Sequence, residues 1–186
     1  MMTMGDTSPL ERVREIFDTP DTIHGCAEST FIALQEHYGL PDPEDSSMAM
    51  ALNGGVAYWG GTCGAITGAA LAVGRLTGTR IEDHATAKRV ARRLTQRLMK
   101  DFLDEFGSLD CRDLTGYDMI ADHDDFLTKS NWRVDCTRRL QYAVARVEGL
   151  IDPARWAAAV AEVTESGEVG PAARSEASEE AGPGPA

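Results

Sequence analysis

Apolar residues recur every three or four positions along most of this chain, which is the spacing of one face of an α-helix. In the longest such segment, His84 to Phe106, this spacing places Val90, Leu94, Leu98 and Phe102 together, and Gly107 ends the segment. It predicts further helices over Pro9 to Phe17, from near Asp21 or Thr22 to Gly39, over Thr62 to Leu76, over Trp132 to Leu150 and onward from Pro153, with a weak turn from Met48 to Leu52. The alternation typical of strands is missing. We therefore expect an all-α fold, a single-domain helical bundle over residues 8–164.

Small residues mark one of these helices as its centre. Gly60, Gly64, Gly68 and Ala72 recur every fourth residue, and such a strip lets another backbone approach closely. The surrounding segment from Ser46 to Gly74 carries no charge and has the length of a membrane span. Its many Gly, Thr and Asn residues dilute the apolar character, so we expect a buried central helix and no membrane span.

Charge and composition narrow the function. The chain of 186 residues has 18 Lys and Arg against 30 Asp and Glu, a formal charge of −12, which excludes a nucleic-acid binder that depends on overall positive charge. Residues 165–186 are rich in Gly, Pro, Ala, Ser and Glu, and we expect a disordered acidic tail there. The first ten residues do not resemble a secretory signal, so we place the protein in the cytoplasm.

The four cysteines are the candidate functional residues. Cys26, Cys63, Cys111 and Cys136 are far apart and form no CxxC pair, so the fold must assemble any shared site. A cytoplasmic compartment keeps thiols reduced, which favours metal ligands or redox thiols over structural disulfides. All but Cys136 follow residues that start or bend a helix, where the helix dipole stabilises a thiolate. We expect Cys63 to face the amides of Ala65 and Ile66 and to be the most reactive thiol, and Cys136 to lie on an apolar helix face.

These cysteines stand in recognisable motifs: Gly25-Cys26-Ala27, the run Gly60-Gly61-Thr62-Cys63-Gly64-Ala65-Ile66-Thr67-Gly68-Ala69, the run Cys111-Arg112-Asp113-Leu114-Thr115-Gly116, and Cys136. Together, from about Phe17 to Val147, they resemble the family named after its motif C-GCAxxG-C-C, which is described as redox-active. The resemblance implies a helical domain with a cysteine-based redox function. Thr30 stands where a GCAxxG motif begun at Gly25 calls for glycine, and no further cysteine precedes Cys26.

Several functions remain open for these thiols. The leading hypothesis is that Cys26, Cys63, Cys111 and Cys136 bind an iron–sulfur cluster, most simply [2Fe–2S], and exchange electrons with an unknown redox partner. The second is cofactor-free thiol–disulfide exchange, with Cys63 as nucleophile and Cys26 or Cys111 as the resolving thiol. A structural zinc site ranks lower, because its closely spaced ligand pairs are absent. A helical interaction module whose cysteines only pack is the alternative without redox chemistry. Small-residue strips also occur in helical proteins that associate, so a homo-oligomer is a further expectation.

Other residues give weaker signals. His24 precedes Cys26 by two positions, where it could join a metal site, although such histidines more often cap helices or lie on the surface. Tyr58 and Trp59 could line a pocket beside Cys63, although core packing is the commoner role of such aromatics. The basic face from Lys88 to Lys100 could receive an anionic substrate, cofactor or acidic partner. We favour a solvated face, or one paired with Asp118 to Asp125.

Overall fold

In the computed structural model, which describes residues 7–19 and 24–165, the chain is all-α. Its elements are α1 (Pro9–Asp18), α2 (Cys26–Tyr38), the 3-10 helix η1 (Ser47–Leu52), α3 (Gly64–Arg80), α4 (His84–Phe106), α5 (Cys111–Thr115), α6 (His123–Lys129), α7 (Trp132–Ile151) and α8 (Pro153–Glu165). The described residues form no strand, only one isolated bridge between Thr62 and Asp110. The expected fold class is therefore confirmed.

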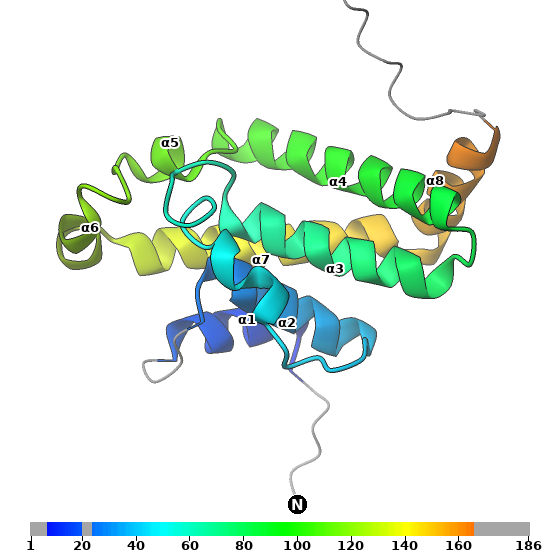
Figure 1. The fold of residues 1–186 in the computed structure, drawn as a ribbon, viewed down its shortest axis with the longest axis horizontal. Helices are drawn as coiled ribbons and strands as arrows, with labels where there is room; N and C mark the ends of the chain where they lie inside the picture. Colours follow the sequence, from blue (N-terminus) through cyan, green and yellow to red (C-terminus); the bar gives the residue numbers. More distant parts are fainter. Residues whose placement is uncertain (1–6, 20–23, 166–186) are drawn as a thin grey trace, which may run out of the picture.

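The long helices lie in three layers (Figure 1). α4 forms one layer, α3 and α7 lie next to it, and α1 and α2 cover the other side. α8 packs on α4 and α7 at one end, while the short helices α5 and α6 lie at the opposite end. The main core runs between these layers and includes Phe31, Leu34, Ile66, Leu94 and Phe102, each at most 2% exposed.

Local sequence signals explain the helix ends. The Ser8 side chain accepts a hydrogen bond from the Glu11 amide at the start of α1, and Asp83 accepts one from the Thr86 amide at the start of α4. Gly39 and Gly107 end α2 and α4 in the left-handed backbone region, with φ of 60° and 79°.

The small-residue strip brings α3 against the start of α2, as expected. A Cβ added at Gly68 would lie 2.2 Å from the carbonyl oxygen of Ala27, and one added at Gly64 would lie 2.2 Å from the Cys26 sulfur. Real Cβ atoms do not approach so closely. The two glycines therefore permit the contact that fixes the position of Cys26 relative to α3.

Some boundaries differ from the sequence-based expectations. α2 begins at Cys26 because Gly25 is its N-cap, and the expected start at Asp21 or Thr22 lies outside the described residues. α3 begins at Gly64 and continues to Arg80. The sequence analysis did not predict α5 and α6. The expected disorder of the tail concerns residues that, from 166 onward, also lie outside the described part. None of the described helices is long and apolar enough to cross a membrane.

The basic face of α4 pairs mainly within the protein. Arg93 and Arg97 both bind Glu162 of α8, the latter at 2.6 Å, and Lys100 binds Asp104 at 2.6 Å. Asp118 instead pairs with Arg112, at 3.1 Å. Of the two expectations for this face, pairing with residues 118–125 is not among these contacts, whereas Lys88, Arg93 and Lys100 are exposed to solvent as expected.

Candidate functional site

Cys26 is the first residue of α2, directly after the N-cap Gly25. Burial raises the pKa of the Cys26 thiol, and the nearby backbone amides of Gly54, Ala27 and Gly64, together with that of Cys26 itself, act against this rise; we call them the amide cradle. They come from three different segments: the start of α2, the loop after η1 and the start of α3. The Ala27 amide donates to the Asn53 side-chain oxygen, and the remaining amides at these helix and loop starts favour negative charge on the sulfur.

A pair of loops brings Cys63 and Cys111 together. The Cys63 amide donates to the Leu109 carbonyl at 2.8 Å, and the Cys111 amide donates to the Gly61 carbonyl at 2.7 Å. Cys63 is the N-cap of α3 and Cys111 is the first residue of α5. Cys26, Cys63 and Cys111 therefore all stand at helix starts, as the sequence predicts.

The fourth cysteine, Cys136, comes from the first half of α7 and is half-buried. A guanidinium nitrogen of Arg139, one turn later, lies 3.9 Å from its sulfur. The four thiols form one electrostatic group, because a charge on Cys26 raises the pKa of each of the other three. No disulfide joins them.

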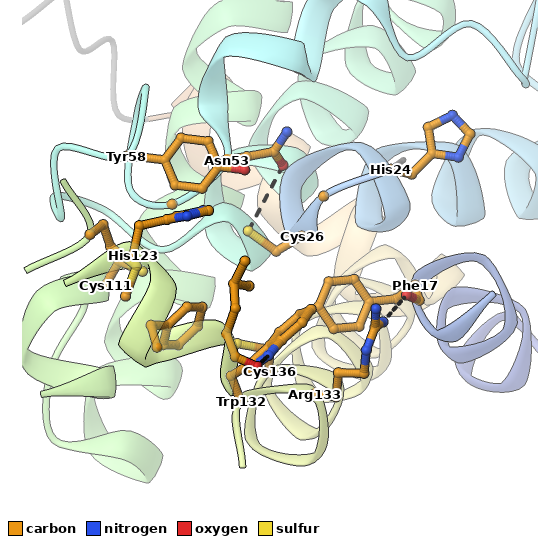
Figure 2. A pocket seen from close by; sticks show the side chains of 15 residues that line it. Phe17, His24, Cys26, Asn53, Tyr58, Cys111, His123, Trp132, Arg133 and Cys136 are labelled. Carbon is orange, nitrogen blue, oxygen red and sulfur yellow. Dashed lines mark hydrogen bonds between the residues drawn. The ribbon is translucent and has the colours of Figure 1, made fainter. Parts of the chain in front are cut away.

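A pocket of about 220 Å³ opens beside these thiols. Figure 2 shows Cys26 between a side formed by Tyr58, His123 and Cys111 and a side formed by Phe17 and Arg133. The lining also includes His24, Gly25, Asn53, Gly54, Met119, Phe126, Leu127, Trp132 and Cys136. Cys63 does not line the pocket and is only 7% exposed. Substrate in this pocket would therefore meet Cys26, Cys111 or Cys136, and not Cys63.

A buried hydrogen-bond network holds the Cys26 end of the pocket. The Glu28 carboxylate is 6% exposed and accepts hydrogen bonds from the Gly25 amide (2.9 Å), the Ser46 hydroxyl (3.0 Å) and the Asn53 side-chain amide (2.8 Å). The Asn53 side-chain oxygen in turn accepts from the Ala27 amide at 2.9 Å and lies 3.9 Å from the Cys26 sulfur. This network ties α2 to the residue that precedes Gly54, and so keeps the amide cradle together.

The loop after Asn53 has an unusual backbone. Gly54 and Gly55 have positive φ, and so do the next three residues, Val56 (64°), Ala57 (51°) and Tyr58 (61°). A left-handed conformation costs a residue with a side chain about 1–2 kcal/mol. The surrounding contacts must offset this strain. In this conformation the Gly54 amide acts on the Cys26 sulfur, and the centres of the Tyr58 and His123 rings lie 5.5 Å apart.

Burial decides the acidity of the thiols. It raises the pKa of Cys111 to about 11 and that of Cys136 to about 12, with repulsion from Cys26 adding to both. The pKa of Cys63 also lies well above the ordinary value, because burial outweighs the amide of Ala65. The expected Ala65 contact is therefore present, but the expectation of a lowered pKa at Cys63 is wrong. Burial also raises the pKa of Cys26, against its four amides.

The side-chain arrangement does not match a metal site. Within residues 7–19 and 24–165, no group of three or more His, Cys, Asp or Glu side chains is placed to hold a metal ion. His24 lines the pocket, yet Figure 2 shows its ring directed away from the cysteines.

Comparison with known sequences agrees with the motif. The profile of the family described as "Putative redox-active protein (C_GCAxxG_C_C)" matches residues 24–150. This chain belongs to that family. No curated protein and no solved structure matches the chain.

The C_GCAxxG_C_C motif can now be placed on the fold. The "AxxG" part of the name is present as Ala65-Ile66-Thr67-Gly68, after Cys63 and Gly64 in reversed order. With this placement, the four cysteines follow the order of the four in the name. Gly68 has a physical role, since it permits the contact with Ala27.

Other pocket residues had weak or no sequence signals. Tyr58 does line the pocket, while Trp59 is 71% exposed. Asn53, Glu28 and Arg133 were not predicted, because a single polar residue near a helix start usually caps the helix or faces water. One signal for Glu28 was available: a glutamate three residues after an N-cap can accept a hydrogen bond from the N-cap amide, as Glu28 does from Gly25.

Proposed function

We propose that this member of the redox-active family is a thiol–disulfide exchange protein in which Cys26 is the attacking thiol and Cys63 the resolving thiol. The observation that supports it best is that the Cys26 sulfur lies both beside the pocket and within a cradle of backbone amides. The pair is one of the two that the sequence suggested, with the roles of the two thiols reversed. The roles are reversed because Cys63 is buried and does not line the pocket.

In the first step, the Cys26 thiolate attacks one sulfur of a substrate disulfide. A bond forms between Cys26 and that sulfur, the substrate S–S bond breaks, and the second substrate sulfur leaves as a thiolate. The amides of Gly54 and Gly64, and that of Cys26 itself, act against the rise in pKa that burial causes and so favour the thiolate form of Cys26.

In the second step, the Cys63 thiolate attacks the Cys26 sulfur of the mixed disulfide. The Cys26–Cys63 bond forms and the first substrate sulfur leaves as a thiolate, so two electrons pass from the protein to the substrate and two thiol protons are released. Cys63 precedes Gly64, whose Cα is in contact with the Cys26 sulfur. Burial keeps Cys63 from external disulfides and leaves the mixed disulfide as its target. A dithiol reductant restores the two thiols in a further exchange.

Trapping the mixed disulfide tests this order. The Cys63→Ser variant, treated with bis(2-hydroxyethyl) disulfide, should accumulate one adduct on Cys26, mapped by peptide mass spectrometry. The wild type should pass on to a Cys26–Cys63 disulfide, and the control Cys136→Ser should behave as the wild type. An adduct on Cys111 with Cys26 still reduced would overturn the assignment.

The [2Fe–2S] cluster is the second candidate, and the observation that favours it is the mutual electrostatic influence of all four thiols. Cluster binding would require their side chains to reorient, since they do not form a metal-binding group as they lie. Anaerobic purification followed by iron and sulfide analysis tests it. Stoichiometric iron and sulfide that disappear in Cys136→Ser would favour the cluster over exchange, because exchange between Cys26 and Cys63 does not need Cys136.

A further inference from the structure

The pocket beside Cys26 differs in its charged residues from the protein as a whole. The chain carries a formal charge of −12, yet among the residues that the structure describes no Asp or Glu lines the pocket. Aromatic rings form much of the lining, among them Phe17, Phe126 and Trp132, and Arg133 supplies a permanent positive charge.

Arg133 is held in place without an acidic partner. Its guanidinium carbon lies 4.5 Å from the centre of the Trp132 ring, and Nη1 donates a hydrogen bond to the Phe17 carbonyl at 3.1 Å. Among the ion pairs of the described residues, none includes Arg133, although its side chain is exposed. An arginine fixed by stacking and by one carbonyl keeps further N–H donors for a carboxylate, which it binds through paired hydrogen bonds.

The acidic side chains described near the pocket have partners other than Arg133. Asp18, next to Phe17, accepts a hydrogen bond from the Thr137 hydroxyl at 3.3 Å and lies 4.0 Å from Arg14. Asp124 contacts His123 at 3.8 Å, and Figure 2 shows His123 on the side of Cys26 opposite to Arg133. Glu28 is buried behind Asn53 and accepts three hydrogen bonds. Its charge is therefore already compensated by donors, and the Arg133 side is the part of the pocket that favours an anion.

We propose that the substrate of this pocket is a small organic disulfide that carries a carboxylate, bound with the carboxylate on Arg133 and the S–S bond at Cys26. This proposal rests on the thiol–disulfide function above. A volume of about 220 Å³ is below the usual range of pockets for drug-sized ligands, so the substrate is small. The aromatic rings contact its apolar part. In the reaction, Cys26 bonds to the substrate half that remains bound, and the other half leaves as a thiolate.

Three aliphatic disulfides of similar size and different charge test the proposal: 3,3′-dithiodipropionate (anionic), bis(2-hydroxyethyl) disulfide (neutral) and cystamine (cationic). The measured quantity is the rate of adduct formation at Cys26 in the Cys63→Ser background, followed by mass spectrometry. Comparing each probe between two proteins cancels its own leaving-group reactivity. The matched control is Arg138→Gln, which removes the same charge from α7 at an exposed residue that pairs with Glu105 outside the pocket.

Relative to the Arg138→Gln control, Arg133→Gln should lower the rate with dithiodipropionate by about tenfold, the effect of losing one charge-assisted contact. The rate with the neutral disulfide should stay within about twofold, and the rate with cystamine should rise. Equal slowing of all three probes would overturn the anion assignment and leave the exchange function standing. Failure of the neutral disulfide to react at Cys26 in either protein would instead contradict the exchange function.

A salt titration of the Cys63→Ser protein with Arg133 intact keeps the proposal testable even where Arg133→Gln disturbs packing on Trp132. Attraction at Arg133 predicts that added salt slows the reaction with dithiodipropionate. The overall negative charge of the protein predicts the opposite, because it repels the anionic probe and salt screens that repulsion. A rate that rises with salt would therefore contradict the proposal.

Discussion

Two walls of the pocket, the one that carries Cys26 and the one that faces it, are built differently. The Cys26 wall consists of Gly25 to Glu28, Asn53, Gly54 and Gly64, and in it glycines are required by contact: an added Cβ at Gly25 would lie 2.3 Å from the Asn53 side chain. The opposite wall consists of residues 111–129, where helices of five and seven residues enclose a small core of Cys111, Met119 and Phe126. An added Cβ at its Gly116 would meet nothing within 4 Å.

This difference suggests a division of roles. Close backbone contact and a buried carboxylate fix the Cys26 sulfur in its amide cradle, as an attacking group requires. The opposite wall has exposed apolar side chains, with Ile120 at 56% and Leu127 at 44%, and a core too small to hold it rigidly. We expect that wall to adjust to substrate while the Cys26 wall stays in place.

The largest effect should come from a side chain that prevents the close contact between α3 and α2. Gly68→Leu should lower the free energy of unfolding by about 3 kcal/mol or more, because its side chain would overlap the Ala27 backbone. Urea denaturation measures this. In the same helix, an added Cβ at Gly74 meets nothing, so Gly74→Ala should instead stabilise by about 0.5–1 kcal/mol. Equal effects at the two positions would show that Gly68 is not a contact residue.

Removal of the buried carboxylate should cost somewhat less. Glu28→Ala leaves the Gly25 amide, the Ser46 hydroxyl and the Asn53 amide without their acceptor and should destabilise by about 2 kcal/mol. Glu28→Gln is the matched variant. The glutamine oxygen can still accept the hydrogen bonds from Gly25 and Asn53 while the glutamine amide donates to the Ser46 hydroxyl. The loss in free energy of unfolding should therefore stay below about 1 kcal/mol. Urea denaturation of both variants checks this, and losses of the same size would contradict the network.

Alkaline pH should destabilise the fold through its buried thiols. Unfolding returns thiols to a pKa near 9.0, whereas the folded values are about 11 for Cys111 and about 12 for Cys136. Between pH 9 and 11 the unfolded chain therefore binds fewer protons, and the free energy of unfolding falls as pH rises, by at most about 1.4 kcal/mol per pH unit for each thiol. Below pH 9 these thiols should contribute no slope. Cys136→Ser should have a shallower slope than the wild type in urea denaturation across this range, and an unchanged slope would contradict the burial of Cys136.

The smallest effect should come from Gly116 of the opposite wall, residues 111–129. Gly116 has φ of 74°, so Gly116→Ala meets backbone strain without a steric overlap and should cost about 1 kcal/mol. Its loss, measured by urea denaturation, should be well below that of Gly68→Leu. A larger loss at Gly116 would mean that the opposite wall is as tightly packed as the Cys26 wall.

Periodicity predicted the long helices well, because each buries one continuous apolar face, as in α4 from His84 to Phe106. It missed α5 and α6, since helices of five and seven residues span too few turns to show a repeat. A Gly54–Gly55 pair is typical of a bend, but nothing local indicates that Val56, Ala57 and Tyr58 continue in the left-handed region. That conformation depends on tertiary contacts.

The sequence analysis named the four cysteines and Tyr58 as candidates but not the other residues around the pocket. Helix-start signals placed Cys26, Cys63 and Cys111 correctly. The order of reactivity depends on depth, which the sequence does not show: Cys63 has the expected Ala65 amide, yet burial raises its pKa. Asn53 reaches Cys26 across a gap of 27 positions, a contact that only the assembled fold creates.

The order in which the four thiols react tests the central claim most directly. The reduced wild-type protein, mixed with less than one equivalent of iodoacetamide, is quenched at successive times, and the four cysteine peptides are quantified by mass spectrometry. The pocket and the amide cradle predict that Cys26 is modified first and that Cys63, buried away from the pocket, is modified last. Modification of Cys63 before Cys26 would contradict the account.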